Sequence, residues 1–151
     1  MKVAEAMRKN IVIVDETISV AEASMSMRKK GEGCAIIFRQ GKPFGIVTER
    51  DVTWKVAGNG LDPKNVKIAE VMSTPLITID PDKDLVEAAK IMKHHKIRRL
   101  AVVREGVLCG VLTAADIARN LERYVDKEIR IILTYLPQLQ KSYFLIGDVL
   151  P

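Results

Sequence analysis

The chain has 151 residues, of which 48% are hydrophobic and only 5% aromatic, and this composition predicts one compact domain with an aliphatic core. Its formal net charge is +5, but its 24 basic and 19 acidic residues are interleaved, which is typical of a solvated surface rather than a long nucleic-acid track. No run is apolar over the length of a membrane span, the first residues are not a secretory signal, and the two cysteines are far apart, so we expect a soluble, cytoplasmic protein.

The first half of the chain predicts strands and helices in a fixed order. We expect a helical turn at residues 3–7, an extended run at 11–14, a helix after Ser19, strands at 34–38 and 44–47, a helix from Thr48, and a linker at 58–63. The helix after Ser19 has apolar residues at the helical period. The strand at 34–38 is continuously apolar, which favours burial on both faces.

The second half repeats this order at a constant offset of 65 residues, from 3–52 to 68–117, without a gap. A repeat of this length predicts two copies of one small unit that pack around a pseudo-twofold axis. We expect the first repeat at residues 1–60 and the second at 61–122. An apolar stripe continues from Ile117 to Leu136, where Pro137 ends it, so residues 123–151 predict a helical extension that packs on this chain or on a second copy. Residues 138–151 have no period that assigns them a role.

The motif Gly-x-x-Thr-x-x-Asp follows a strand in both copies, with Thr48 and Asp51 in the first and Thr113 and Asp116 in the second. This is the spacing of a capping box, in which threonine and aspartate satisfy the free amides of a helix start. The same place offers a positive dipole end to a phosphate, and its carboxylate can accept two hydrogen bonds from the vicinal diol of a ribose. Capping and nucleotide binding are compatible, so we expect function in the seam between the copies.

The doubled pattern resembles a tandem pair of cystathionine β-synthase (CBS) domains. The resemblance covers residues 3–121 and rests most strongly on 69–75 (AEVMSTP), 95–103 (HKIRRLAVV) and 110–116 (GVLTAAD). It implies an α+β fold of two pseudo-twofold-related β-α-β-β-α halves, here with the C-terminal helical extension. It also implies two clefts between the halves that take adenosine-containing ligands such as AMP, ADP, ATP or S-adenosylmethionine.

In that family the aspartate of the motif holds the ribose, and basic residues before the middle strand hold the phosphate. The resemblance therefore implies a cleft, called here the Asp116 cleft, formed by Thr113, Asp116, Arg98, Arg99 and Val111, with Asn10, Ile11, Val12 and Gly33 on its opposite wall. The Asp51 cleft would use Thr48, Asp51, Ile46 and Arg50, with Thr74, Ile77 and Ile79 opposite. Because the first copy has Glu32-Gly33-Cys34 in place of Ile97-Arg98-Arg99, we expect the Asp116 cleft to bind more tightly, or alone.

The residues assemble no nucleophile, acid–base pair or metal-ligand set, so we expect a regulatory module without a cofactor or an enzymatic activity. His94 and His95 are adjacent on a helix and point about 100° apart, so they cannot share a metal. The expected partners are the adenosine ligand, a second copy in a homodimer, and a regulated protein that the sequence does not identify. Two alternatives stay open: a nucleic-acid-binding regulator that uses its basic rims, and an assembly module with empty clefts.

Overall fold

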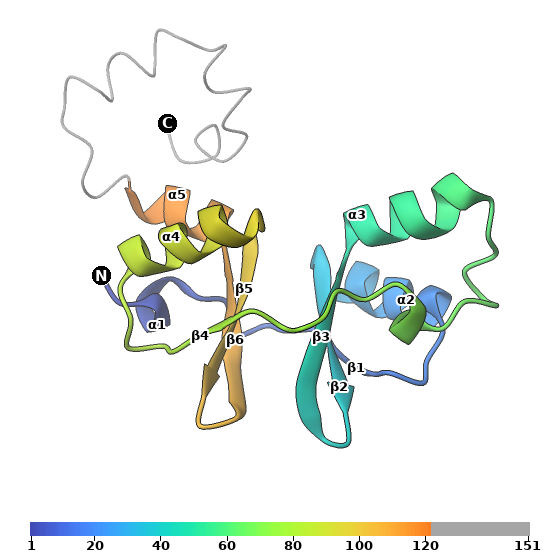
Figure 1. Ribbon diagram of the computed structural model, residues 1–151, viewed down its shortest axis with the longest axis horizontal. Coiled ribbons are helices and arrows are strands. Elements are labelled where there is room, and N and C mark those ends of the chain that lie inside the picture. Colours follow the sequence, from blue (N-terminus) through green and yellow to red (C-terminus); the bar gives the residue numbers. More distant parts are fainter. Residues whose placement is uncertain (122–151) are drawn as a thin grey trace, which may run out of the picture.

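The computed structural model describes residues 1–121, which form two similar halves placed side by side (Figure 1). The first half contains β1 (Ile13–Asp15), α2 (Val20–Lys30), β2 (Cys34–Arg39), β3 (Lys42–Thr48) and α3 (Glu49–Asp51), then a π-helical turn η1 (Val52–Val56) and a 3-10 turn η2 (Ala57–Asn59). The second half contains β4 (Thr78–Ile79), α4 (Leu85–His95), β5 (Arg99–Arg104), β6 (Val107–Thr113) and α5 (Ala114–Leu121). Two short turns, α1 (Val3–Ala6) and η3 (Ile68–Glu70), precede the halves in sequence. The predicted α+β fold with two β-α-β-β-α halves is confirmed.

Each half contains one three-stranded sheet, in the order β1-β2-β3 or β4-β5-β6. The outer strand is parallel to the middle one, which then pairs antiparallel with the third through a tight hairpin. Both hairpin turns have two residues with positive φ, Gln40 (50°) and Gly41 (73°) in the first half and Glu105 (50°) and Gly106 (79°) in the second. Turns of this left-handed kind match the twist of the two strands that they join, as the turn residues predict.

The helices begin at the residues that the sequence indicates. The Ser19 hydroxyl accepts a hydrogen bond from the Glu22 amide at 3.1 Å, and the Asp84 carboxylate accepts one from the Glu87 amide at 2.8 Å. Each bond satisfies a free donor in the first turn of α2 or α4. The predicted helix from Thr48 is less regular than expected, because its second turn is the π-helical η1. Helical structure also continues to Asn59, into the predicted linker.

Within residues 1–121 the core has three parts, one inside each half and one between the two sheets. The part between the sheets includes buried side chains of Cys34, Ile36, Ala101 and Val111, so the two sheets face each other over an apolar contact. No helix within residues 1–121 has both the length and the apolar character needed to cross a membrane.

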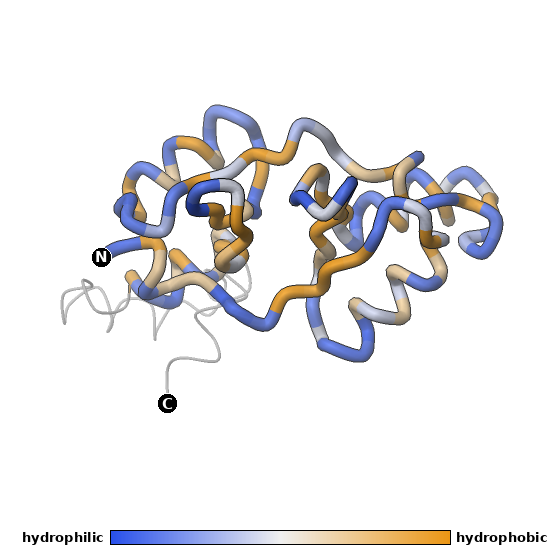
Figure 2. The backbone as a smooth tube through the Cα atoms, turned by 90° about the horizontal axis from the view of Figure 1, so that it is seen from below, coloured by the Kyte–Doolittle hydropathy of each residue, from blue (hydrophilic) through white to orange (hydrophobic). Residues whose placement is uncertain are grey.

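The halves exchange the short turns that precede them in sequence. Val3 of α1 is fully buried in the core of the second half, and its amide donates to the Lys83 carbonyl at 2.8 Å. Ile68 of η3 is fully buried in the core of the first half, and its amide donates to the Ile18 carbonyl at 2.9 Å. Figure 2 shows the two stretches of chain that cross between the halves. The predicted ranges 1–60 and 61–122 remain predictions of sequence repeats, and the packing of the described residues crosses between them. The predicted extension at 123–151 lies outside the described residues.

Candidate functional site

Four strand ends place the site at one end of the seam between the sheets. Cys34 begins β2 beside Thr48 at the end of β3, and Arg99 begins β5 beside Thr113 at the end of β6. The helices α3 and α5 start directly after the two threonines. The two Thr-x-x-Asp motifs, which are 65 residues apart in sequence, are thus presented at corresponding corners of the fold.

Both motifs form the predicted capping contacts. The Asp116 Oδ2 atom accepts hydrogen bonds from the Thr113 amide at 2.9 Å and from the Thr113 hydroxyl at 2.7 Å. The Thr113 hydroxyl in turn accepts from the Asp116 amide at 3.1 Å. Asp51 and Thr48 make the same three contacts, at 2.8, 3.1 and 3.4 Å. The structural role predicted for the two motifs is confirmed.

Asp116 is only 3% exposed and is paired with two arginines. Its Oδ1 atom accepts a hydrogen bond from Arg8 Nε at 2.9 Å and a second from Arg119, one turn further along α5. Burial alone would raise the pKa of this carboxyl, but the hydrogen bonds from Thr113 and Arg8 outweigh it and hold the pKa of Asp116 below its ordinary value. The pKa of Arg8 is raised, chiefly by its hydrogen bond to Asp116. Asp116 is therefore an ionised carboxylate at neutral pH.

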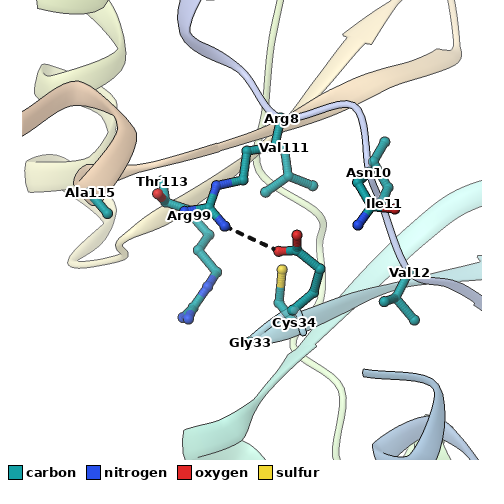
Figure 3. A pocket seen from close by; sticks show the side chains of 11 residues that line it. Arg8, Asn10, Ile11, Val12, Gly33, Cys34, Arg99, Val111, Thr113 and Ala115 are labelled. Carbon is teal, nitrogen blue, oxygen red and sulfur yellow. Dashed lines mark hydrogen bonds and ion pairs between the residues drawn. The ribbon is translucent and has the colours of Figure 1, made fainter. Parts of the chain in front are cut away.

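A cavity of about 130 Å³ lies beside this pair, between the two halves (Figure 3). It is lined by Arg8, Asn10, Ile11, Val12, Glu32, Gly33, Cys34, Arg99, Val111, Thr113 and Ala115. Seven of these were predicted for the Asp116 cleft: Asn10, Ile11, Val12, Gly33, Arg99, Val111 and Thr113. Its volume is below the roughly 300–1,000 Å³ of most ligand sites, so the cleft is partly filled by its own side chains.

Arg8, Glu32, Cys34 and Ala115 line the cavity but were not among the predicted site residues. The repeat gives no signal for Arg8, because the equivalent position of the second copy is Ser73. Arg8 reaches Asp116 because the crossing segment that follows α1 pairs with β6, where the Arg8 amide donates to the Val111 carbonyl at 2.9 Å. A contact of this kind, between segments of different repeats, depends on the tertiary fold and cannot be read from the repeat pattern.

The charged groups in the cleft come from both halves. Arg8 Nη1 lies 3.4 Å from Glu32 Oε2, the contact drawn as a dashed line in Figure 3. Arg99 makes no salt bridge within residues 1–121, and its Nη2 atom lies 2.8 Å from the position that a Cβ on Gly33 would occupy. The Glu49 Oε2 atom lies 3.1 Å from the same Cβ position, and the guanidinium of Arg99, which makes no salt bridge there, is suited to bind an anion.

Arg98 differs from its neighbour, because it is exposed and does not line the cavity. Its main chain still contributes locally, since its carbonyl accepts a hydrogen bond from the Ala114 amide at the start of α5 at 2.8 Å. Of the arginine pair expected to hold a phosphate, the structure thus brings Arg99 to the cavity, together with Arg8 from the N-terminal segment.

The residues of the Asp51 cleft are less closely grouped. Asp51 Oδ1 pairs with Lys55 at 2.9 Å, and the guanidinium of Arg50 stacks over the ring of Trp54 at 3.8 Å. Ile46 packs in the core between the sheets. It also forms a β-bridge with Ser73, which lies on the stretch of chain after η3.

The predicted far wall of the Asp51 cleft is divided between other sites. Thr74 lines a wider, mainly apolar hollow of about 580 Å³ near the hairpin turns, with Phe44 and Leu76. Ile77 packs against the core of the second half, and Ile79 is buried inside it. That hollow is larger than the Asp116 cavity, but among the described residues Lys42 is the one charged group that lines it, so converging ionic groups are lacking there.

Cys34 lines the cavity and is buried, whereas Cys109 is half-buried, and both thiols are free. Burial raises the pKa of the Cys34 thiol, so it is protonated at neutral pH. His94 and His95 lie edge to face at 4.9 Å, and no group of three possible metal ligands occurs within residues 1–121.

Comparison with known proteins gives a consistent family assignment. The model of the CBS domain matches twice, at residues 3–58 and 68–123. An uncharacterized protein of Methanopyrus kandleri is 36% identical over 119 residues, which are 78% of this chain and 61% of that protein, so the chain spans less than two thirds of that relative. A CBS domain-containing protein of Bacillus subtilis is 30% identical over 118 residues, covering 78% of this chain and 84% of the relative. Among solved structures, a CBS domain protein from Pyrobaculum aerophilum complexed with AMP superposes with a TM-score of 0.72 at 24% identity, over 89% of this chain and 99% of the other.

Proposed function

The chain belongs to the CBS domain family, and on that premise we propose that it is a non-catalytic regulatory module that binds an adenosine-containing ligand in the Asp116 cleft. The likeness to the AMP complex of the Pyrobaculum protein establishes the fold alone, and the residues of this cleft are what support a ligand. The strongest single support is that Arg8 and Arg99 line one cavity in the seam and that Arg8 is paired there with the ionised, buried Asp116, which does not itself line the cavity.

The three parts of an adenosine nucleotide match three kinds of group in the cleft. Ile11, Val12 and Val111 offer apolar surface to a base. The Asp116 carboxylate is an acceptor for the ribose diol. Arg8 and Arg99 are cations within reach of a phosphate, which guanidinium groups bind with paired hydrogen bonds.

Ligand binding would act on the packing of the two halves, because the lining residues come from both. A ligand that binds only the folded state at 100 times its Kd stabilises that state by about 2.7 kcal/mol. For a chain of this size, 1 kcal/mol corresponds to roughly 2–4 °C, so the melting temperature should rise by about 5–10 °C. A thermal-shift screen with AMP, ADP, ATP and S-adenosylmethionine measures this directly.

Calorimetric titration of Asp116→Ala tests the assignment of the site. A hydrogen bond to a charged group contributes about 1.5–3 kcal/mol, and 1.4 kcal/mol is a tenfold change in affinity, so the variant should bind at least about tenfold more weakly. Asp51→Ala is the matched control, since it removes the equivalent carboxylate of the other repeat. Circular dichroism must show both variants folded at the titration temperature. Equal affinity in wild type and Asp116→Ala would refute the assignment.

We also propose that the protein acts as a homodimer. Two large hydrophobic side chains are exposed after the two motifs, Trp54 on η1 (63%) and Leu121 at the end of α5 (51%). Burial of such side chains against a second copy would remove apolar surface from water. Sedimentation velocity should show a dimer for the wild type and a shift towards monomer for Trp54→Glu; an unchanged dimer in the variant would exclude Trp54 from the interface.

A further inference from the structure

The acceptor capacity of Asp116 is fully used in the free protein. A carboxylate offers about four lone-pair sites. Two are taken by the amide and hydroxyl of Thr113 at Oδ2, and two by Arg8 and Arg119 at Oδ1. A ribose diol can therefore bind Asp116 only if one of these donors leaves.

Arg8 is the donor that lies in the cavity and takes no part in the cap of α5. Thr113 is held as the cap of α5, and Arg119 lies on the same helix as Asp116 and does not line the cavity. Arg8 does line the cavity, and 38% of its side chain is exposed, so water can already solvate part of its guanidinium. Its second contact, to Glu32 at 3.4 Å, is longer than an ordinary charged hydrogen bond.

The small volume of the cavity also indicates that Arg8 must move when a ligand binds. About 130 Å³ is too little for a nucleotide, and the Arg8 side chain reaches from Asp116 on the second half to Glu32 on the first. Movement of this one arginine would enlarge the cavity and free Asp116 at the same time.

We propose, on the basis of the function proposed above, that Arg8 determines ligand specificity by exchanging its partner, from Asp116 in the free protein to the phosphate of the bound ligand. A nucleoside must break the contact between Arg8 and Asp116 and gives Arg8 no anion in return. A nucleoside monophosphate breaks the same contact and supplies a dianion beside Arg8 and Arg99. The cleft thereby selects phosphorylated over unphosphorylated adenosine, and Arg8 is a specificity-determining residue.

Titration of the full chain with adenosine and with AMP tests this exchange. The wild type should bind AMP at least tenfold more tightly than adenosine. Arg8→Met keeps a side chain of similar length without the charge; it should bind adenosine more tightly than the wild type does and AMP more weakly, so that the preference for AMP falls at least tenfold. Arg8→Lys should keep most of the preference, because it restores the cation. A preference for AMP in Arg8→Met within threefold of the wild-type value would overturn the proposal.

A second measurement covers the case in which Arg8→Met does not fold. In wild-type protein labelled with ¹⁵N, the Nε–H resonance of Arg8 reports its bond to Asp116, and saturation with AMP should shift it. A resonance that stays unchanged at saturation would overturn the exchange. If none of adenosine, AMP, ADP, ATP and S-adenosylmethionine binds the wild type, the proposed function fails along with this inference. If one of the other ligands binds but AMP does not, or if adenosine and AMP bind with a ratio that Arg8 does not affect, only the inference fails.

Discussion

The substitution Asp116→Asn changes the buried carboxylate into a neutral side chain of the same shape. An asparagine has one acceptor atom, so it can keep the two contacts to Thr113 but then turns its amide towards Arg8 and Arg119. Two charge-assisted hydrogen bonds are lost, each worth about 1.5–3 kcal/mol. Because the side chains of Arg8 and Arg119 are 38% and 35% exposed, water compensates part of the loss, and we expect the lower limit, about 3 kcal/mol of unfolding free energy.

Urea denaturation at pH 7 measures this difference, and the melting temperature should fall by about 6–12 °C. The pKa of Asp116 is lowered in the folded state relative to 3.8 for the free side chain, so its charge stabilises the fold above that pH. The stabilisation is lost as the pH falls through the folded pKa, and the gap between wild type and variant should close there. Asp51→Asn is the matched control, with a smaller expected loss because its partner is one half-exposed lysine. Equal losses for the two variants, or a gap that stays constant into strong acid, would refute this account of Asp116.

Two further substitutions and one labelling experiment test the site and the packing. Gly33→Val places a Cβ 2.8 Å from Arg99 Nη2 and fills the cavity. Calorimetry should therefore show at least about tenfold weaker AMP binding in this variant. Undiminished affinity would argue against this cavity as the site. Ile68→Ala should cost about 3 kcal/mol in urea denaturation, because Ile68 is fully buried in the first half; a cost below about 1 kcal/mol would contradict the exchange of turns between the halves. An alkylating reagent should modify Cys34 more slowly than Cys109, as followed by mass spectrometry, because burial raises the pKa of the Cys34 thiol. Bound AMP should slow the alkylation of Cys34 further. Equal rates for the two cysteines would contradict the burial of Cys34.

The parts of the fold that could be predicted are those encoded by local patterns. Ser19, Asp84 and the two Thr-x-x-Asp motifs begin helices because each supplies an acceptor to the free amides that follow it. The wall formed by Asn10, Ile11 and Val12 also followed from the resemblance.

The exchange of α1 and η3 could not be predicted from the repeat. The two copies offer similar apolar surfaces to either turn, so the pattern alone does not show which half Val3 or Ile68 packs against. The partner of Asp116 depends on this exchange, since Arg8 follows α1 along the chain. Ile79, which was predicted for the wall of the Asp51 cleft, instead lies on β4 inside the core of the second half.

The cavity beside Asp116 also depends on sequence differences between the two repeats. Gly33 and Ala115 line it, and the offset of 65 residues pairs them with Arg98 and Arg50. The small side chains leave space at the Asp116 cleft where the other copy has arginines. Sequence comparison within the chain gave this difference at Gly33, but the cavity itself depends on how the two halves meet.

A crystal structure of the full chain grown with AMP is the most direct test of the proposed site. We expect the nucleotide in the seam, with its ribose hydroxyls within hydrogen-bond distance of Asp116 and its phosphate contacting Arg8 and Arg99. A structure in which saturating AMP binds elsewhere, while Arg8 stays on Asp116, would contradict it.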